Sequence, residues 1–172
     1  ASGLRVITLA YHQILAGDSN VVIAGGTESM SNVPHLVMNA RWGQKMGDLR
    51  TVDAIFHDGL HCAIEGYHMG VTAENLVDRY RISREAQDVF ALESQQKAIK
   101  AKEQGKFEKE IVPVSIKSKK GTTLFKEDEN LKNTNIEKLQ TLKPAFRENG
   151  TVTAGNASSL NDGAAAVIVA SE

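Results

Sequence analysis

The segment of the sequence best suited to bind a ligand is a run of small residues, Thr153-Ala154-Gly155-Asn156-Ala157-Ser158-Ser159. Small side chains let a ligand or another backbone approach closely, because little stands in the way. An ordinary turn before a strand would have the same composition. Composition alone therefore leaves both interpretations open.

Three single residues could also carry chemistry. His68 lies in Gly66-Tyr67-His68-Met69-Gly70, Cys62 is the one thiol of the chain, and Trp42 is its one indole. A lone histidine is more often structural than catalytic, and a thiol with no activating neighbour is most simply a small buried apolar residue. Trp42 could either pack on the surface of its own chain or anchor an interface with another chain.

Motifs for other chemistry are missing. The sequence has no HExxH, CxxC, P-loop or GxGxxG pattern, so we expect no metal site and no cofactor. With 20 basic and 21 acidic residues, it favours neither a nucleic acid nor a membrane surface as partner. No apolar run approaches the roughly 20 residues of a membrane helix. One cysteine fits a reducing compartment, and we expect a soluble, cytoplasmic protein.

Two apolar strands and a helix must hold the small-residue run in place. Residues 4–15 are apolar around most of a helical circumference, and Gly17 ends that helix. Residues 21–24 and 164–170 are short apolar runs typical of strands covered on both faces. A helix followed by a buried strand is an α/β signature.

The middle of the chain is less regular. Residues 27–70 lack periodicity and predict a functional or docking loop. Helices are expected over 72–80 and 83–105, the second beginning at Ser83 and with Ala86, Val89 and Phe90 on its apolar face. Residues 112–116 read as an edge strand, and 126–143 as a loop or short helix.

The order of several motifs resembles the thiolase family. Ala1-Ser2-Gly3-Leu4 and Val21-Val22-Ile23-Ala24-Gly25-Gly26-Thr27-Glu28-Ser29-Met30-Ser31 are similar to its CASG and AGGTESMS stretches. Lys45-Met46-Gly47-Asp48, Tyr67-His68-Met69-Gly70, Leu142-Lys143-Pro144-Ala145-Phe146, Gly150-Thr151-Val152-Thr153-Ala154-Gly155-Asn156-Ala157-Ser158 and Leu160-Asn161-Asp162-Gly163 continue it in order. The resemblance covers essentially the whole chain.

The resemblance implies an α/β fold, the thiolase fold, with a loop domain inserted into the first of two similar core halves. Residues 1–29 and 151–172 would belong to that core, and 30–150 to the loop domain that covers coenzyme A. In the family the nucleophilic cysteine immediately precedes the ASG sequence, so it would stand just before Ala1. The catalytic histidine and second cysteine lie in the C-terminal half. We therefore expect an internal fragment that contains no catalytic residue.

For coenzyme A, the resemblance assigns contacts position by position. Ser158 matches the serine that hydrogen-bonds the pantetheine arm, and Ala154 and Gly155 match residues that let the arm approach. Phe146 and Leu142 match apolar contacts to coenzyme A. The thioesters are substrates of the family, so no cofactor is implied.

The remaining assignments concern the two ends of the substrate. Lys132 falls where relatives place a basic residue near the nucleotide, and His68 and Met69 match the pair that lines the acyl pocket. The His68-Met69-Gly70 triplet resembles that of acetoacetyl-CoA thiolases, whereas long-chain enzymes typically have a proline in place of this histidine. The implied reaction condenses two acetyl-CoA to acetoacetyl-CoA, or reverses it, through a cysteine acyl-enzyme.

Two alternatives and one assembly remain open. The chain could belong to a broad 3-ketoacyl-CoA thiolase, or act alone as a non-catalytic module that binds coenzyme A or supports assembly. The family members with the KMGD-containing insertion resemble tetramers built through this loop. We therefore expect a homotetramer, a dimer of dimers, that uses residues 34–48, with Trp42 and Met46 as anchors.

Overall fold

The computed structural model describes residues 2–172, which form two compact units. The first unit contains the residues up to Leu60 together with Leu160–Glu172, and the second is His61–Ser159. A discontinuous unit interrupted by a continuous one is the chain order expected from the sequence. The unit boundaries follow residues 60 and 159, not 29 and 150, and the loop domain as a functional division stays a prediction.

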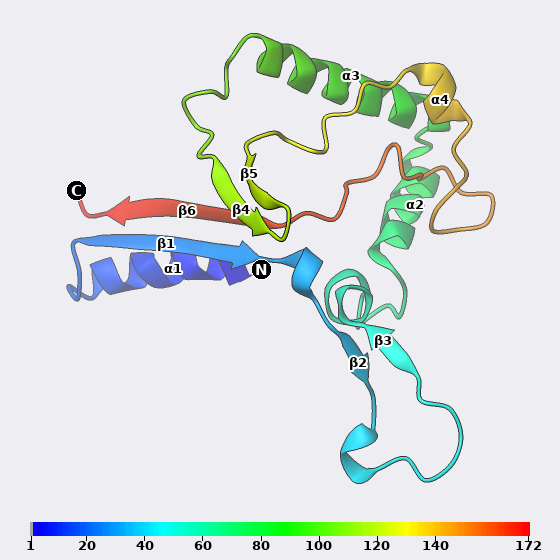
Figure 1. Cartoon of the computed structure of the whole chain (residues 1–172), viewed down its shortest axis with the longest axis horizontal. Helices are drawn as coiled ribbons and strands as arrows, with labels where there is room; N and C mark the ends of the chain where they lie inside the picture. Colours follow the sequence, from blue (N-terminus) through cyan, green and yellow to red (C-terminus); the bar gives the residue numbers. More distant parts are fainter. Residues whose placement is uncertain (1) are drawn as a thin grey trace. The chain divides into compact units, whose positions relative to one another are not determined.

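The first unit is built on a helix and two paired strands, drawn side by side in Figure 1. Helix α1 is Ser2–Leu15, and strands β1, Val21–Glu28, and β6, Gly163–Ala170, pair antiparallel. Gly17, at φ +78°, ends the helix as expected. The N–H groups of Gly17 and Asp18 donate to the carbonyls of Ile14 and Gln13, the two bonds of a Schellman motif.

The two faces of this strand pair differ, which corrects one expectation. Val22 and Val169 are half-buried and Ala24 is buried, whereas Ile23 and its partner Ile168 are 74% and 72% exposed. Helix α1 contacts both strands, and the alternation of burial shows that one face is covered. The prediction that both strands are covered on two faces is therefore wrong for this chain.

The irregular stretch after β1 contains short elements rather than one open loop. Strands β2, His35–Val37, and β3, Thr51–Asp53, pair antiparallel at the base of a long connection (Figure 1). Short helical turns occupy Met30–Asn32, Ala40–Trp42 and Ile55–Leu60. Ser31 is bonded to Asp162, whose carboxylate accepts from the backbone N–H at 2.9 Å and from the hydroxyl.

The second unit is mainly helical. Its elements are α2, Met69–Tyr80, α3, Arg84–Glu103, and α4, Ile136–Gln140, with a hairpin of β4, Val114–Ser118, and β5, Gly121–Phe125. Ser83 caps α3 as expected: its hydroxyl oxygen accepts from the N–H of Ala86 at 3.1 Å. Helix α2 begins three residues before the expected start, and β5 was not predicted.

The centre of the second unit is unusually polar. Leu139 and Val152 are buried, but the largest fully buried side chains of the described residues are Glu74, Asp88 and Thr153. Phe90, expected on the apolar face of α3, is 77% exposed instead. Gln87 and Asp88 face inward in its place, because their side chains bond the segment that follows residue 150.

Candidate functional site

The start of helix α2 carries the first part of the candidate site. Nδ1 of His68 accepts a hydrogen bond from the N–H of Gly70 at 2.8 Å and so caps the helix. A nitrogen that accepts carries no proton, so the proton of the neutral ring is on Nε2. The imidazole stacks on the ring of Phe146, with centroids 4.7 Å apart. The structure thus brings together two residues separated by 78 positions.

Glycine is required at position 70. A Cβ added there would lie 2.2 Å from Cγ of Phe146, well inside contact distance. The aromatic ring therefore packs directly on the first turn of α2. Met69 precedes this glycine on the same turn of the helix and is 49% exposed.

A short stretch of chain pairing joins Phe146 to the small-residue run. The N–H of Ala145 donates to the carbonyl of Val152 at 2.9 Å, and Pro144 and Thr153 form an antiparallel bridge. The backbone of residues 144–146 therefore lies alongside that of 152–153. Residues predicted from two separate motifs are therefore adjacent in the second unit.

Gly155 packs against two leucines. A Cβ at this position would lie 2.6 Å from Cδ2 of Leu139 and 2.6 Å from Cδ1 of Leu142. Leu139 is buried, whereas Leu142 is 36% exposed. The absence of a side chain at Gly155 is thus used by the protein's own packing, and Ala154 beside it is exposed.

The small-residue run begins as an ordered turn, which we call the 153–156 turn. Its hydrogen bonds are Asn156 N–H to the Thr153 carbonyl at 3.3 Å, Gly155 N–H to Thr153 Oγ1 at 3.1 Å and Thr153 N–H to Asn156 Oδ1 at 2.7 Å. Ser158 follows two residues later and is exposed. The run therefore begins with a turn. Its possible contacts with a ligand are those of the side chains and backbone groups that it exposes.

A buried glutamate holds the chain just before that turn. Oε1 of Glu74 on α2 accepts from the N–H groups of Thr151 and Val152, both at 2.8 Å, and Oε2 from the hydroxyl of Thr151 at 3.2 Å. Arg147 lies 3.5 Å from the same carboxylate and donates two bonds to Asp78, at 2.8 and 3.1 Å. A buried charge must be paired in this way.

The hydrogen bond from Arg147, helped by the charge of its guanidinium, holds the pKa of Asp78 below its ordinary value. Bonds from the side chain and backbone of Ser31 lower the pKa of Asp162 in the first unit. Both carboxylates are thus stabilised as anions. Neither can therefore serve as a general acid near neutral pH.

Sequence analysis missed the polar residues that support the site, namely Glu74, Asp88, Arg84, Gln87, Asn156 and Arg147. A signal for some of them was present in the spacing. Arg84 and Asp88 are one turn apart on α3, and Glu74 and Asp78 have the same spacing on α2. Such pairs are usually solvent-exposed, so spacing alone does not show that one member is buried.

The structure gathers most, but not all, of the predicted site residues. His68, Met69, Phe146, Leu142, Ala154 and Gly155 are linked through direct contacts or short chain pairing, and Ser158 follows. Lys132 is exposed, and its backbone N–H donates to Gln95 of α3 at 2.9 Å. Its described contact is therefore with α3, and its role at a nucleotide stays a prediction.

Chemically, these residues are suited to contact a ligand. They offer an aromatic and a thioether surface, two small residues and a hydroxyl, which suit a long, thin, partly apolar ligand. Within residues 2–172, no three His, Cys, Asp or Glu side chains are grouped as metal ligands. No helix in the described part of the chain is long and apolar enough to cross a bilayer.

A comparison with protein families decides the assignment. The family model described as the N-terminal domain of thiolase matches residues 1–172. The chain belongs to the thiolase family. Its α/β fold is shared with solved thiolases, and this agreement confirms the fold expected from the sequence.

Individual thiolases give the same result. A Staphylococcus aureus protein named probable acetyl-CoA acyltransferase is 54% identical over 173 residues, 99% of this chain and 44% of that protein. Human mitochondrial 3-ketoacyl-CoA thiolase is 43% identical with a TM-score of 0.90, over 99% of this chain and 44% of that one. Bacillus anthracis acetyl-CoA acetyltransferase is 45% identical with a TM-score of 0.90, over 98% and 43%. The chain spans less than half the length of each.

Proposed function

We propose that the complete natural protein carrying this sequence is an acetyl-CoA C-acetyltransferase, which condenses two acetyl-CoA to acetoacetyl-CoA and catalyses the reverse thiolysis. The observation that carries the proposal is the cluster at the start of α2. Met69 directly follows in sequence a histidine that is held by its cap and by its stack on Phe146. A thioether at that point would narrow the space for an acyl chain.

Substrate binding is proposed to follow the surface of the second unit. The pantetheine arm would run over Ala154 and Gly155, donate to or accept from the hydroxyl of Ser158, and contact Phe146 and Leu142. Lys132 would face the nucleotide end. These positions are supported by the contacts that join the start of α2 to Phe146 and the neighbouring chain to the residues just before the 153–156 turn.

The chemical step would use a residue outside this sequence. The nucleophilic cysteine is expected immediately before Ala1, and Ala1 itself lies outside the described residues. Helix α1 begins at Ser2, so a cysteine there would stand at the positive end of the helix dipole. Such a position lowers a thiol pKa from about 8.5 into the range of roughly 3.5 to 7.5. The thiolate would attack the carbonyl of one acetyl-CoA and release coenzyme A, which leaves an acetyl-enzyme. A second acetyl-CoA would lose an α-proton to a base, and its enolate would attack the acetyl-enzyme, which forms acetoacetyl-CoA and releases the cysteine thiolate.

A broad 3-ketoacyl-CoA thiolase is the second candidate, favoured by the 43% identity to the human mitochondrial enzyme. A non-catalytic module remains the candidate of another class. Steady-state thiolysis by the complete protein of acetoacetyl-CoA and 3-ketohexanoyl-CoA separates all three. We expect kcat/KM to be at least tenfold higher for acetoacetyl-CoA, about the cost of accommodating two methylenes. Equal values would favour the broad enzyme, and no turnover by the complete protein would leave the module.

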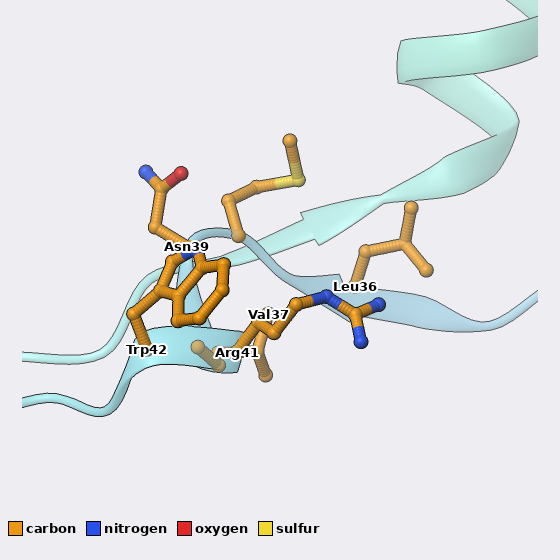
Figure 2. A pocket seen from close by; sticks show the side chains of 7 residues that line it. Leu36, Val37, Asn39, Arg41 and Trp42 are labelled. Carbon is orange, nitrogen blue, oxygen red and sulfur yellow. The ribbon is translucent and has the colours of Figure 1, made fainter.

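The connection between β2 and β3 is proposed to join two dimers into a tetramer. Residues 36–42 line a pocket there, and Figure 2 shows Trp42 and Arg41 on the short helical turn at this pocket. Trp42 and Met46 are 89% and 92% exposed, as anchors awaiting a partner surface would be. In sedimentation, Trp42→Ala should weaken the tetramer, while Phe90→Ala, another exposed aromatic, should not. A tetramer unchanged by Trp42→Ala would contradict this.

Residues 30–150 are proposed to act as the loop domain over coenzyme A, between core segments 1–29 and 151–172. Cytoplasmic location also stays a prediction, supported by the single cysteine of the sequence.

A further inference from the structure

A buried carboxylate on α3 reaches the 153–156 turn through one side chain. Oδ1 of Asp88 accepts from Nδ2 of Asn156 at 2.9 Å, and Oδ2 accepts from Nε of Arg84 at 2.7 Å. Asp88 is completely buried. Each of its oxygens therefore meets a donor, and the carboxylate cannot turn without losing one of them.

The side chain of Asn156 uses both ends of its amide. Its oxygen accepts from the N–H of Thr153 at 2.7 Å, and its nitrogen donates to the carbonyl of Thr151 at 3.1 Å as well as to Asp88. An amide alone among the side chains offers an acceptor and two donors in this geometry. Asn156 thus fixes both the shape of the turn and its distance from α3.

Arg84 extends the same arrangement to the leucines behind Gly155. Its Nη2 donates to the carbonyls of Leu139 at 2.6 Å and Leu142 at 3.1 Å. The side chains of those leucines contact the position where Gly155 lacks a Cβ. One buried ion pair therefore anchors the turn from both sides.

Stability is a weak reason for such an arrangement. Well-packed apolar residues commonly replace a buried ion pair with no loss of stability. What they cannot replace is the directional bond that places Asn156. The 153–156 turn contains Ala154 and Gly155 and leads to Ser158, the residues proposed to receive the pantetheine arm.

We propose that Asp88 and Asn156 form a positioning pair that holds the 153–156 turn where an acyl-CoA thioester binds. The inference rests on the proposed function, because it names the support of that same site. Neither residue needs to touch the substrate. If the pair is broken, the turn occupies the binding-competent position only part of the time. The apparent affinity for the thioester is then the intrinsic affinity multiplied by the fraction of time that the turn spends in that position.

The test is a reciprocal exchange in the complete natural protein. Asn156→Asp places two carboxylates next to each other. Asp88→Asn replaces one acceptor oxygen with an amide N–H group, which then faces a donor, either Arg84 or Asn156. In the double variant the new amide can accept from Arg84 and donate to the new carboxylate. The ion pair with Arg84 and the bond to the Thr151 carbonyl are then lost, and a carboxylate oxygen faces that carbonyl, so rescue should be substantial but incomplete.

We expect each single variant to raise KM for acetoacetyl-CoA by about tenfold, the result of a competent turn populated about a tenth of the time. Because the reacting groups are untouched, kcat should stay within about twofold. The double variant should recover KM to within about threefold of wild type, as coupled residues do in a double-mutant cycle. Exchange of the Thr153 and Gly155 amide hydrogens should speed up in the singles and slow again in the double.

Ser83→Ala is the matched control, because it removes a cap from the same helix without touching the turn. It should lower the melting temperature and leave KM unchanged. If a single variant fails to fold, Asn156→Ala replaces it, since the smaller side chain admits water to Asp88. Unchanged KM in the singles, an equal fall in kcat, or a double variant no better than the singles overturns the inference.

The failure of the proposed function would look different. A wild-type protein that neither binds coenzyme A in calorimetry nor turns over acetoacetyl-CoA would refute that function, whatever the variants do. A wild-type enzyme that is active, with KM indifferent to Asp88 and Asn156, would refute only the positioning pair.

Discussion

The apolar strand pair of the first unit and the buried polar residues of the second unit differ in what surrounds their side chains. Strands β1 and β6 pair Ile23 with Ile168 on one face, and among residues 2–172 these two side chains are 74% and 72% exposed. In the second unit, Glu74 and Asp88 are completely buried, and each meets several donors. The apolar face of the first unit is therefore left exposed within residues 2–172, whereas the buried carboxylates of the second unit have their hydrogen-bond partners.

The difference shows what each region depends on. An apolar face gains stability from any surface of suitable shape, so β1 and β6 depend on further chain or on a second subunit. A buried carboxylate depends on individual donors at fixed places. Residues 150–156 therefore acquire a defined position within the second unit itself, and a ligand can use it.

Glu74→Ala should give the largest effect. It strands the N–H groups of Thr151 and Val152 and leaves Arg147 without one of its partners. Breaking a buried pair in this way costs about 3–5 kcal/mol. Denaturant unfolding of the complete protein, read by a probe in residues 61–159, measures this cost.

The matched control is Glu93→Ala, which removes the exposed partner of Lys97 on α3. It should change the free energy of unfolding by less than about 0.5 kcal/mol. Equal losses from the two substitutions would show that the buried network contributes nothing particular.

Ile23→Ala tests the other side of the comparison. If further chain covers the open face in the complete protein, the substitution should cost about 2–5 kcal/mol there, as for a buried isoleucine. A cost below about 0.5 kcal/mol, as for a side chain already in water, would show that the face stays open. Denaturant unfolding of the complete protein with and without the substitution gives the value.

The smallest effects on stability should appear at acid pH. Salt should change the pKa of one carboxylate in the second unit, Asp78, more than that of one in the first unit, Asp162. The pKa values of Asp78 and Asp162 are lower in the folded protein than in the unfolded chain. Their contribution to stability is therefore complete above the ordinary pKa and is lost as the pH falls through the lowered value. Carboxyl titration by NMR checks both shifts.

High salt screens the charge of Arg147 and should raise the pKa of Asp78 toward its ordinary value. Asp162 is held by uncharged hydroxyl and amide donors, so its pKa should respond less. Equal salt responses would mean that the charge of Arg147 is not what distinguishes the two carboxylates.

Local signals in the sequence predicted the helices and main strands of this chain well. Gly17, Ser83 and Gly105 mark helix ends through backbone geometry and capping, which depend on neighbouring residues only. The motif order also identified the family and the fold. Contacts between residues that are distant in the sequence were harder to predict. The outward position of Phe90 could not be predicted, because Gln87 and Asp88 are drawn inward by partners more than 60 residues away.

The sequence predicted that His68 and Phe146 lie in one site, but not the polar residues that hold the neighbouring chain, and the role of the site residues at a ligand stays a prediction. Matching motifs placed His68 and Phe146 in one site, and the ring stack now joins them. The need for glycine at position 70 appears only once the Phe146 ring is in place. Similarly, Glu74 reads as an ordinary helical surface residue until the N–H groups of Thr151 and Val152 are seen to meet it.

The most direct test of the account is the chain-length preference of Met69→Ala in the complete natural protein. Opening the space at Met69 should let added methylenes be buried, each worth about 0.8 kcal/mol or roughly fourfold in kcat/KM. Ser158→Ala, the matched control, should raise KM for every thioester by about threefold to tenfold through the loss of one hydrogen bond. We therefore predict that the ratio of kcat/KM for 3-ketohexanoyl-CoA over acetoacetyl-CoA rises about tenfold in Met69→Ala and stays flat in Ser158→Ala. A ratio unchanged by Met69→Ala would contradict the assignment of this residue, and with it the short-chain function.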